Sequence, residues 1–288
     1  MPKPVVIKLR SLPTGRLFAS GWLPALLFPL TIAAGLASTP VFAADNLHDQ
    51  GILAWLTAPL DPSRPHEIDG TTAWHGRLMV AVWLLLFPAG VIMARFFKIT
   101  PAQNWPCELD NKRWWRTHLA TQYAGGALLL IALGLALQAA SFGEAGFYHR
   151  LFGWLAMALA GWQFLGGWLR GSKGGPTDPR PDGSLHGDHY DMTHRRLLFE
   201  FAHKFGGYLA LLVAWIAIPS GLWLVNAPRW MGLSLILCLV LLIGLAIRFQ
   251  IRGYARDTYE AIWGPGREHP GNRRPPIGFG VNRKGNQK

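Results

Sequence analysis

Five stretches of this chain run for 17 to 27 residues without a Lys, Arg, Asp or Glu. They cover residues 78–94, 117–143, 151–169, 205–228 and 230–247. A membrane interior about 30 Å thick is crossed by about 20 apolar residues in a helix. None of the five stretches shows the polar stripe expected of a helix in a soluble bundle. The sequence therefore predicts an all-α membrane protein with five transmembrane helices.

The composition agrees with this class. Only 15% of the 288 residues are charged, whereas an ordinary soluble domain has about 25%. The net charge of +12 is concentrated in particular loops and the tail, as membrane topology requires. No single basic face is evident, so no nucleic-acid partner is expected.

The chain is predicted to begin with a secretory signal. Residues 1–43 combine a basic start, a long apolar run and small residues before Ala44. An uncleaved signal anchor is the alternative. The expected organisation then continues with a short periplasmic segment at 44–72, a transmembrane domain at 73–250 and a basic cytoplasmic tail at 251–288. The tail is rich in Gly, Pro and Arg and is expected to hold little regular structure.

The basic residues also predict the direction of each helix. The segments 44–74, 140–148 and 226–229 contain only Arg64 and Arg229, whereas the intervening segments and the tail contain most of the Lys and Arg. Because Lys and Arg are retained on the cytoplasmic side, we expect a multi-pass protein of a bacterial inner (plasma) membrane. Its mature N-terminus would be periplasmic and its C-terminus cytoplasmic.

Four histidines lie near the starts of four successive apolar stretches: His75, His118, His149 and His203. Because successive helices alternate in direction, His75 and His149 are expected near the outer face, and His118 and His203 near the inner face. Each alone could be an interfacial side chain with a solvated tip. Together, two pairs at two depths favour two haem b groups, each with its iron bound between two histidines from different helices.

Two cations accompany these histidines. Haem propionates are carboxylates, which Arg and Lys side chains can bind. Arg150 follows His149 on the outer side, where membrane topology gives no reason for a positive charge. Lys204 follows His203 on the inner side, where topology alone would also explain it. Arg150 and Lys204 are therefore the predicted cofactor-binding cations.

Four segments that contain these residues resemble helices of the cytochrome b561 family, in a bacterial-type form. They read HGRLMVAVWLLLFPAGVIMARFFK, WWRTHLATQ, HRLFGWLAMALAGWQFLGGWLR and HKFGGYLALLVAWIAIPSGLWL. The resemblance runs from about His75 to the end of the fifth stretch. It implies a four-helix haem-binding core, two b-type haems with two histidine ligands each, and electron transfer across the membrane. Nothing in the loops indicates an ascorbate site, so the electron donor is not implied.

An iron with two histidine ligands passes electrons rather than performing chemistry on a bound substrate. We therefore expect no catalytic residue, and two different midpoint potentials because the two sites have different surroundings. The expected function is electron transfer between a donor and an acceptor on opposite faces. The donor and the acceptor would each be a small molecule or a protein, and a membrane quinone is one candidate.

Other functions stay open. The chain could be the cytochrome b subunit of a larger membrane oxidoreductase complex, or a superoxide or quinone oxidoreductase. A proton-relay transporter is a more remote alternative, because the sequence shows neither broken helices nor internal repeats. Whether the protein is itself an enzyme is also open, as is a homodimer in the lipid bilayer.

A second group of histidines lies in the predicted inner loop 185–196, which reads LHGDHYDMTHRR and contains His186, His189 and His194. A solvated docking surface for a soluble partner or a quinone headgroup is the favoured interpretation. A metal site is the alternative, since the residue types alone do not define its geometry.

Overall fold

The computed structural model describes residues 51–139, 142–170 and 193–283. All of them belong to one compact unit, Phe42–Lys288. The predicted signal at 1–43 and residues 185–192 of the histidine-containing loop lie outside the described residues.

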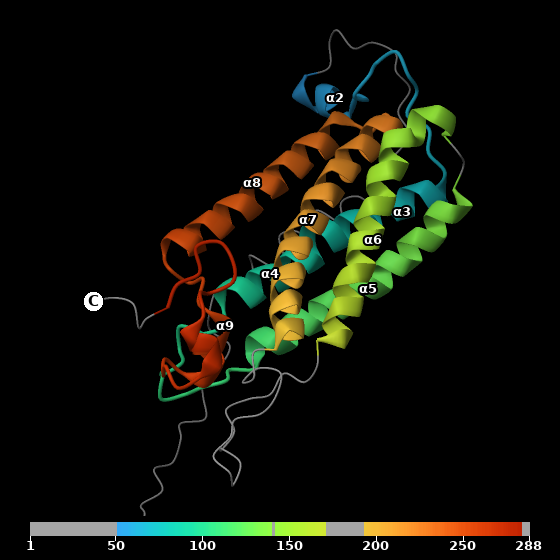
Figure 1. Ribbon diagram of the computed structural model, residues 1–288. Helices are drawn as coiled ribbons and strands as arrows, with labels where there is room; N and C mark the ends of the chain where they lie inside the picture. The colour runs from blue at the N-terminus through green and yellow to red at the C-terminus, as the bar shows by residue number, and fades with distance from the viewer. Residues whose placement is uncertain (1–50, 140–141, 171–192, 284–288) are drawn as a thin grey trace, which may run out of the picture. The chain divides into compact units, whose positions relative to one another are not determined.

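Every regular element in the described ranges is a helix (Figure 1), which confirms the all-α prediction for this part of the chain. The elements are α2 (Ile52–Thr57), α3 (Gly70–Val80), the π-helical turn η1 (Ala81–Leu86), α4 (Phe87–Phe96), α5 (Arg113–Gln138), the 3-10 turn η2 (Gly143–Gly146), α6 (Phe147–Leu169), α7 (His194–Leu224), α8 (Arg229–Ile251), α9 (Thr258–Trp263) and the 3-10 turn η3 (Pro270–Arg273).

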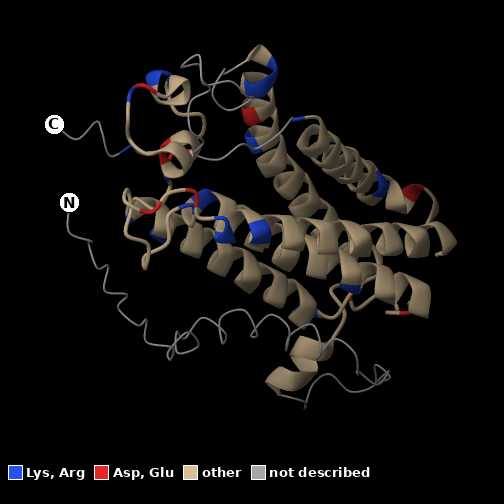
Figure 2. Cartoon of the chain, turned by 90° about the horizontal axis from the view of Figure 1, so that it is seen from below, with Lys and Arg blue, Asp and Glu red and all other residues tan. Residues whose placement is uncertain are grey.

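Four of the five predicted spans are confirmed as helices long and apolar enough to cross a membrane. They are Gly70–Phe96, Arg113–Gln138, His194–Leu224 and Arg229–Ile251. Their middle portions carry no charged residues (Figure 2). The remaining predicted span, residues 151–169, lies within the 23-residue helix α6, which is not among the four. Its Trp, Gly and Gln residues lower its mean hydropathy.

Helices α3 and α4 form one rod that is interrupted by the π-helical turn η1. The rod begins at Asp69, whose carboxylate accepts a hydrogen bond from the Thr72 amide. Pro88 follows η1 at the start of α4, so the missing proline N–H coincides with a locally widened helix. The carbonyl of Trp83, within η1, accepts a hydrogen bond from the indole of Trp215 in α7 at 3.0 Å. The irregular turn thus connects this rod to α7.

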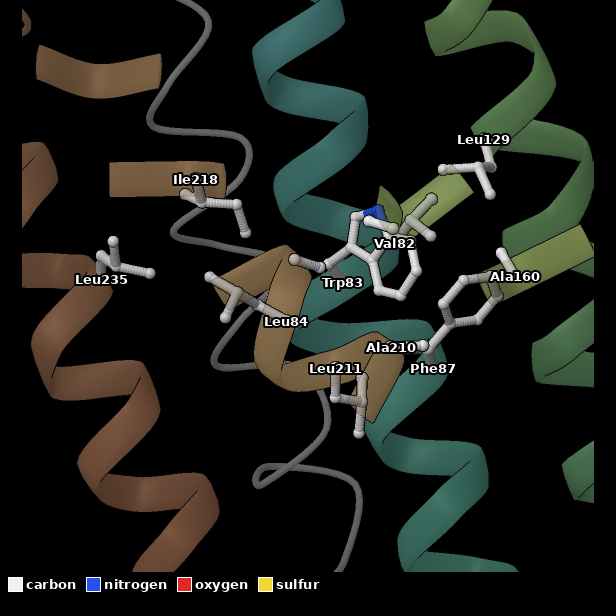
Figure 3. Packing of buried hydrophobic residues seen from close by; sticks show 12 residues of the cluster. Val82, Trp83, Leu84, Phe87, Leu129, Ala160, Ala210, Leu211, Ile218 and Leu235 are labelled. Carbon is white, nitrogen blue, oxygen red and sulfur yellow. The ribbon is translucent and has the colours of Figure 1, made fainter. Parts of the chain in front are cut away.

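The long helices form two antiparallel hairpins. The α3–α4 rod packs along α5, and α6 packs along α7. Between them lies a core of large side chains from η1 and α4, such as Trp83 and Phe87, against small residues of the other hairpin, such as Ala160 and Ala210 (Figure 3). The small residues let the second hairpin approach the aromatic rings closely. Helix α8 contacts α4 and α7.

The described part of the tail, residues 252–283, is folded and contains α9 and η3, which corrects the expectation that the tail is mostly unstructured. We call residues 252–283 the cap. Its Tyr259, Ile262 and Trp263 are each at most 3% exposed and pack with Trp114 of α5. These large apolar side chains bury enough surface to fix a segment whose Gly and Pro content alone predicts disorder.

The cap is closed on itself near its end. Arg283 forms an ion pair with buried Asp257 at 3.2 Å and donates hydrogen bonds to the carbonyls of Gly271 and Asn272, each at 2.9 Å. The main chain of Asn282 also pairs with that of Ala255 and Asp257. Figure 1 shows the cap at the end of the helices where α5 and α7 begin.

The opposite end is held by a short loop, residues 58–66, which packs on the α7–α8 turn. Buried Asn226 adopts a left-handed backbone conformation, with φ at 50°. Its side chain accepts a hydrogen bond from the Asp61 amide at 2.8 Å and donates to the carbonyls of Asp61 and Arg64 at 2.9 and 2.6 Å. We call this side the loop end and the other the cap end.

Candidate cofactor-binding site

The four predicted histidines are brought together in two pairs, one at each end of the bundle. His75 of α3 lies next to His149 of α6, with ring centres 6.1 Å apart. His118 of α5 lies next to His203 of α7, also at 6.1 Å. All four side chains are partly buried. Each pair joins one hairpin to the other.

Three of these rings are oriented by main-chain carbonyls of the neighbouring helix in the same hairpin. Nδ1 of His75 lies 2.9 Å from the Ala132 carbonyl oxygen in α5. In the reciprocal contact, Nδ1 of His118 lies 3.0 Å from the Gly90 carbonyl in α4. A ring whose Nδ1–H donates to a carbonyl has the lone pair on Nε2, which is the tautomer that a metal ligand requires.

The second hairpin shows the same pattern once. Nδ1 of His149 lies 3.0 Å from the Ala217 carbonyl of α7, and Ser220 Oγ is 3.4 Å from the same nitrogen. A Cβ atom added at Gly221 would lie 2.8 Å from the ring of His149. Glycine at 221 therefore allows α7 to approach this imidazole. The remaining histidine, His203, faces a side chain instead, that of Gln163 in α6.

A common register underlies these contacts. Ala132 lies fourteen residues after His118 on α5, and Ala217 lies fourteen after His203 on α7. Helices α5 and α7 thus each carry, about 21 Å beyond their own histidine, the carbonyl that faces the histidine of the other helix in the hairpin. On the α3–α4 rod the interval from His75 to Gly90 is fifteen, because a π-helical turn adds one residue to a helix.

The spacing of the rings fits a six-coordinate metal centre. Two imidazoles on opposite sides of one ion have ring centres about 6 Å apart, given about 2 Å per metal–nitrogen bond and about 1 Å from each nitrogen to its ring centre. Both pairs match this separation, with ring planes at 90° and 85° to each other. The donor set therefore fits two haem irons, each between two histidines.

At the cap end the histidines line a cavity of about 360 Å³ that also carries an excess of positive charge. Its lining includes one carboxylate, Glu200, and five cations: Arg95, Lys98, Arg170, Arg196 and Lys204. Glu200 is buried between Arg196 and Lys204, at 2.5 and 2.7 Å. The surplus of cations suits an anionic ligand such as a haem carboxylate.

Lys204, one of the two predicted cofactor-binding cations, is therefore located in this cavity. Its ammonium also donates to the Ile277 carbonyl of the cap at 3.1 Å. The other predicted cation, Arg150, is exposed at the loop end and donates to the Gly143 carbonyl of η2 at 2.7 Å. Binding of a propionate by either residue stays a prediction.

The sequence analysis missed two contributors to this site. One is the cap, which supplies Thr258, Ile262 and Gly278 to the lining of the cavity. The apolar run of α9 was the available signal for it. The other is Gln163, which lies fourteen residues after His149, the same interval that separates histidine and acceptor on α5 and α7.

Comparison with known proteins points in the same direction. The chain is 27% identical over 201 residues to a cytochrome b561, DM13 and DOMON domain-containing protein of Arabidopsis thaliana, which covers 66% of this chain and 20% of that protein. It is 24% identical over 219 residues to a putative ferric-chelate reductase 1 homolog of Drosophila melanogaster, which covers 74% of this chain and 30% of that protein.

The chain is thus distantly related to cytochrome b561 and ferric-chelate reductase proteins. It spans between a fifth and a third of the length of these two relatives. No family model and no solved structure matches it. The resemblance expected from the histidine-containing segments is therefore supported as distant homology.

Proposed function

We propose that this chain is a di-haem b membrane cytochrome that carries electrons between a donor and an acceptor on opposite faces of a membrane. His75 and His149 would bind one haem, and His118 and His203 the other. The observation that carries the proposal is the 6.1 Å separation of the rings in both pairs. The orientation of Nδ1 toward carbonyls at three of the four rings supports it.

We further propose that α6 crosses the membrane as a fifth span. Along its length it exposes large apolar side chains, including Trp154, Trp162 and Leu165, at 55%, 60% and 48%. Such exposure suits contact with lipid. The loop end would be periplasmic and the cap end cytoplasmic in a bacterial inner membrane, because of the distribution of Lys and Arg. A signal peptide or anchor at 1–43 belongs to the same proposal.

When bound, each haem supplies an iron that changes its charge by one electron. The histidine pairs would hold the two irons at two depths. Fourteen residues separate the contacts of the two pairs on α5, and likewise on α7, so the two pairs are about 21 Å apart along either helix. Trp83 and Phe87, which pack edge to face at 4.9 Å, fill the core between the levels and exclude water there.

The donor and acceptor are also part of the proposal. Because two histidines would hold each iron, partners would exchange electrons with the haem without binding to the iron. A quinone, a small redox protein or a ferric chelate, the last suggested by the name of the Drosophila relative, would fit this mode. The alternative, in which the chain is the cytochrome b subunit of a larger oxidoreductase complex, would use the same four histidines to bind the haems.

Spectroscopy of the purified full-length chain tests the proposal. We expect sharp reduced bands of six-coordinate haem b and two haems per chain by quantitative extraction. A colourless protein from porphyrin-replete cells would overturn the proposal, and one haem per chain would overturn the two-site form of it.

Substitution of the ligands tests the pairing. Changing either His75 or His149 to Ala should remove one haem, and changing either His118 or His203 should remove the other, because an iron with one histidine loses half of its protein ligands. His66, which bonds to the Val225 carbonyl at the loop end, is the control, and its replacement should leave both haems bound. Loss of haem in any other grouping contradicts the assignment.

A further inference from the structure

His203 differs from the other three paired histidines in the group that faces its Nδ1. The others face main-chain carbonyls, whereas His203 faces the side-chain amide of Gln163. We propose that Gln163 is the positioning residue of the cap-end haem: its amide oxygen accepts the Nδ1–H of His203 and so keeps Nε2 as the metal-binding nitrogen. This inference rests on the proposed function.

The contact is close and involves both ends of the amide. One terminal atom of Gln163 is 2.8 Å from Nδ1 and 2.9 Å from the carbonyl oxygen of His203, and the other is 3.1 Å from the Gly207 nitrogen. With the amide nitrogen toward the ring, all three distances are hydrogen bonds: to Nδ1, to the His203 carbonyl and from the Gly207 amide. With the amide oxygen toward the ring, the contact to Nδ1 is the one hydrogen bond among them.

The two orientations of the amide correspond to different tautomers of the ring. If the amide nitrogen faces Nδ1, the ring accepts there and carries its proton on Nε2, which excludes Nε2 from binding a metal. That orientation also satisfies the His203 carbonyl and the Gly207 amide. If the oxygen faces Nδ1, the ring donates and Nε2 has its lone pair. Metal binding through Nε2 therefore requires the second orientation, in which the amide gives up its bonds to the His203 carbonyl and from the Gly207 amide. A bound metal would thus determine which way the amide faces.

The surrounding helix makes room for this amide. A Cβ atom added at Gly206 would lie 2.5 Å from the end of the Gln163 side chain. A larger residue at 206 would therefore displace the amide from the ring. Gly206 and Gly207 lie three and four residues after His203, so the histidine and the space for its partner are about one turn of α7 apart.

The other hairpin shows why a side chain is needed here. The register places Gly90 on the α3–α4 rod where α6 has Gln163, and its carbonyl receives His118. Four residues after each histidine, α5 has Gln122 and α7 has Gly207. A Cβ atom at Gly90 would lie 2.2 Å from the Gln122 amide. In one hairpin the glycine is on the α3–α4 rod (Gly90) and the glutamine on α5 (Gln122). In the other the glutamine is on α6 (Gln163) and the glycine on α7 (Gly207).

This difference between the hairpins has a consequence for experiment. A main-chain carbonyl cannot be removed by substitution, whereas a glutamine side chain can. Among the four paired histidines, His203 is therefore the one whose Nδ1 partner can be changed while the ligand itself is kept.

The expected effect is on the redox potential of one haem. An acceptor at Nδ1–H makes the imidazole a stronger donor to iron, which stabilises the oxidised state. Gln163→Leu removes the acceptor and should raise the cap-end midpoint potential. Gln163→Glu supplies a stronger acceptor of the same shape and should lower it. The loop-end haem, bound by His75 and His149, should keep its potential in both variants.

Redox titration of the full chain, followed by absorbance, measures both midpoints at once. The cap-end haem is identified as the one missing from His203→Ala. Gln122→Leu is the matched control, because it removes an amide from the same cavity that bonds to the Phe87 carbonyl and not to a histidine. We also expect Gln163→Leu to weaken cap-end haem binding about 10- to 100-fold, as loss of such an orienting partner does elsewhere.

Opposite shifts for Gln163→Leu and Gln163→Glu, confined to one haem, support the role of Gln163. Unchanged midpoints, shifts in the same direction, or an equal shift in Gln122→Leu overturn it. If Gln163→Leu fails to fold, the isosteric Gln163→Glu decides alone: a lowered cap-end midpoint supports the inference and an unchanged one overturns it.

These outcomes differ from failure of the proposed function. A wild-type chain without two haems rejects the function itself. Two haems that are lost in the expected pairs, with midpoints indifferent to residue 163, reject only the positioning role.

Discussion

Each end of the bundle has a histidine pair with the same ring separation, but the two ends are closed in different ways. At the loop end, residues 58–66 attach to the α7–α8 turn through hydrogen bonds around Asn226. At the cap end, a folded segment with its own apolar core rests on α4, α5 and α7. The contact at the loop end is short and mainly polar, whereas the contact at the cap end buries Tyr259, Ile262 and Trp263.

Main-chain carbonyls of the cap also accept hydrogen bonds from three basic side chains that line the cavity. Lys98 donates to the Arg256 carbonyl, Arg95 to that of Phe279 and Lys204 to that of Ile277. Charged side chains near a haem shift its potential. Two histidine pairs of the same geometry therefore have different surroundings. This difference supports the expectation of two different midpoint potentials.

The largest effect should come from the apolar core of the cap. Trp263→Ala should cost about 3–5 kcal/mol of cap stability, because a large buried ring leaves a cavity. Since the cap is small, it should open locally, so hydrogen exchange in 252–283 should accelerate by a factor of about 100 or more. Exchange around Asn226 should not change.

Phe279→Ala is the control for that change, because this cap aromatic is 66% exposed. Its replacement should leave cap exchange close to that of the wild type. Equal acceleration at both ends in Trp263→Ala would mean that the cap does not open independently.

A smaller effect is expected at Asn226. Asn226→Ala should cost about 3 kcal/mol, from three lost hydrogen bonds at about 1 kcal/mol each, offset in part by solvation, and from a left-handed backbone worth about 1 kcal/mol. Asn226→Gly should cost less, since glycine tolerates the positive φ. Thermal unfolding in detergent measures both. Equal losses would mean that the backbone conformation contributes nothing.

The last effect concerns pH. Burial, together with the charge of Lys204, lowers the pKa of Lys98 to about 7. The other charged groups that act on it are Arg95, Glu200 and Asp257. Between pH 7 and its ordinary pKa of 10.5 the unfolded chain binds more protons at this lysine than the folded chain, so its contribution to stability should rise with pH over that range.

Lys98→Met should therefore flatten the increase in stability between about pH 7 and 10, as measured by unfolding temperature in detergent across a pH series. Lys112→Met, at a lysine whose side chain is 60% exposed, should keep the wild-type slope. A slope that persists unchanged in Lys98→Met would contradict a buried, largely neutral amine at this position.

Much of the framework could be predicted from the sequence, because the position and direction of membrane helices follow local rules. The absence of charges indicated where the helices lie, and their alternating direction predicted that His75 lies near His149 and His118 near His203. The role of Gln163 depends on the register between α6 and α7, which requires knowledge of how the helices pack. The cap depends on Trp114 and Trp263, which lie far apart in the chain and meet only in the folded structure.

The order of synthesis gives the cap one more consequence. A ribosome completes all four histidine-bearing helices before it reaches residue 252. The wall that the cap gives to the cavity beside His118 and His203 is therefore added after those helices. The ion pair between Arg283 and Asp257, which closes the cap on itself, can form only after that.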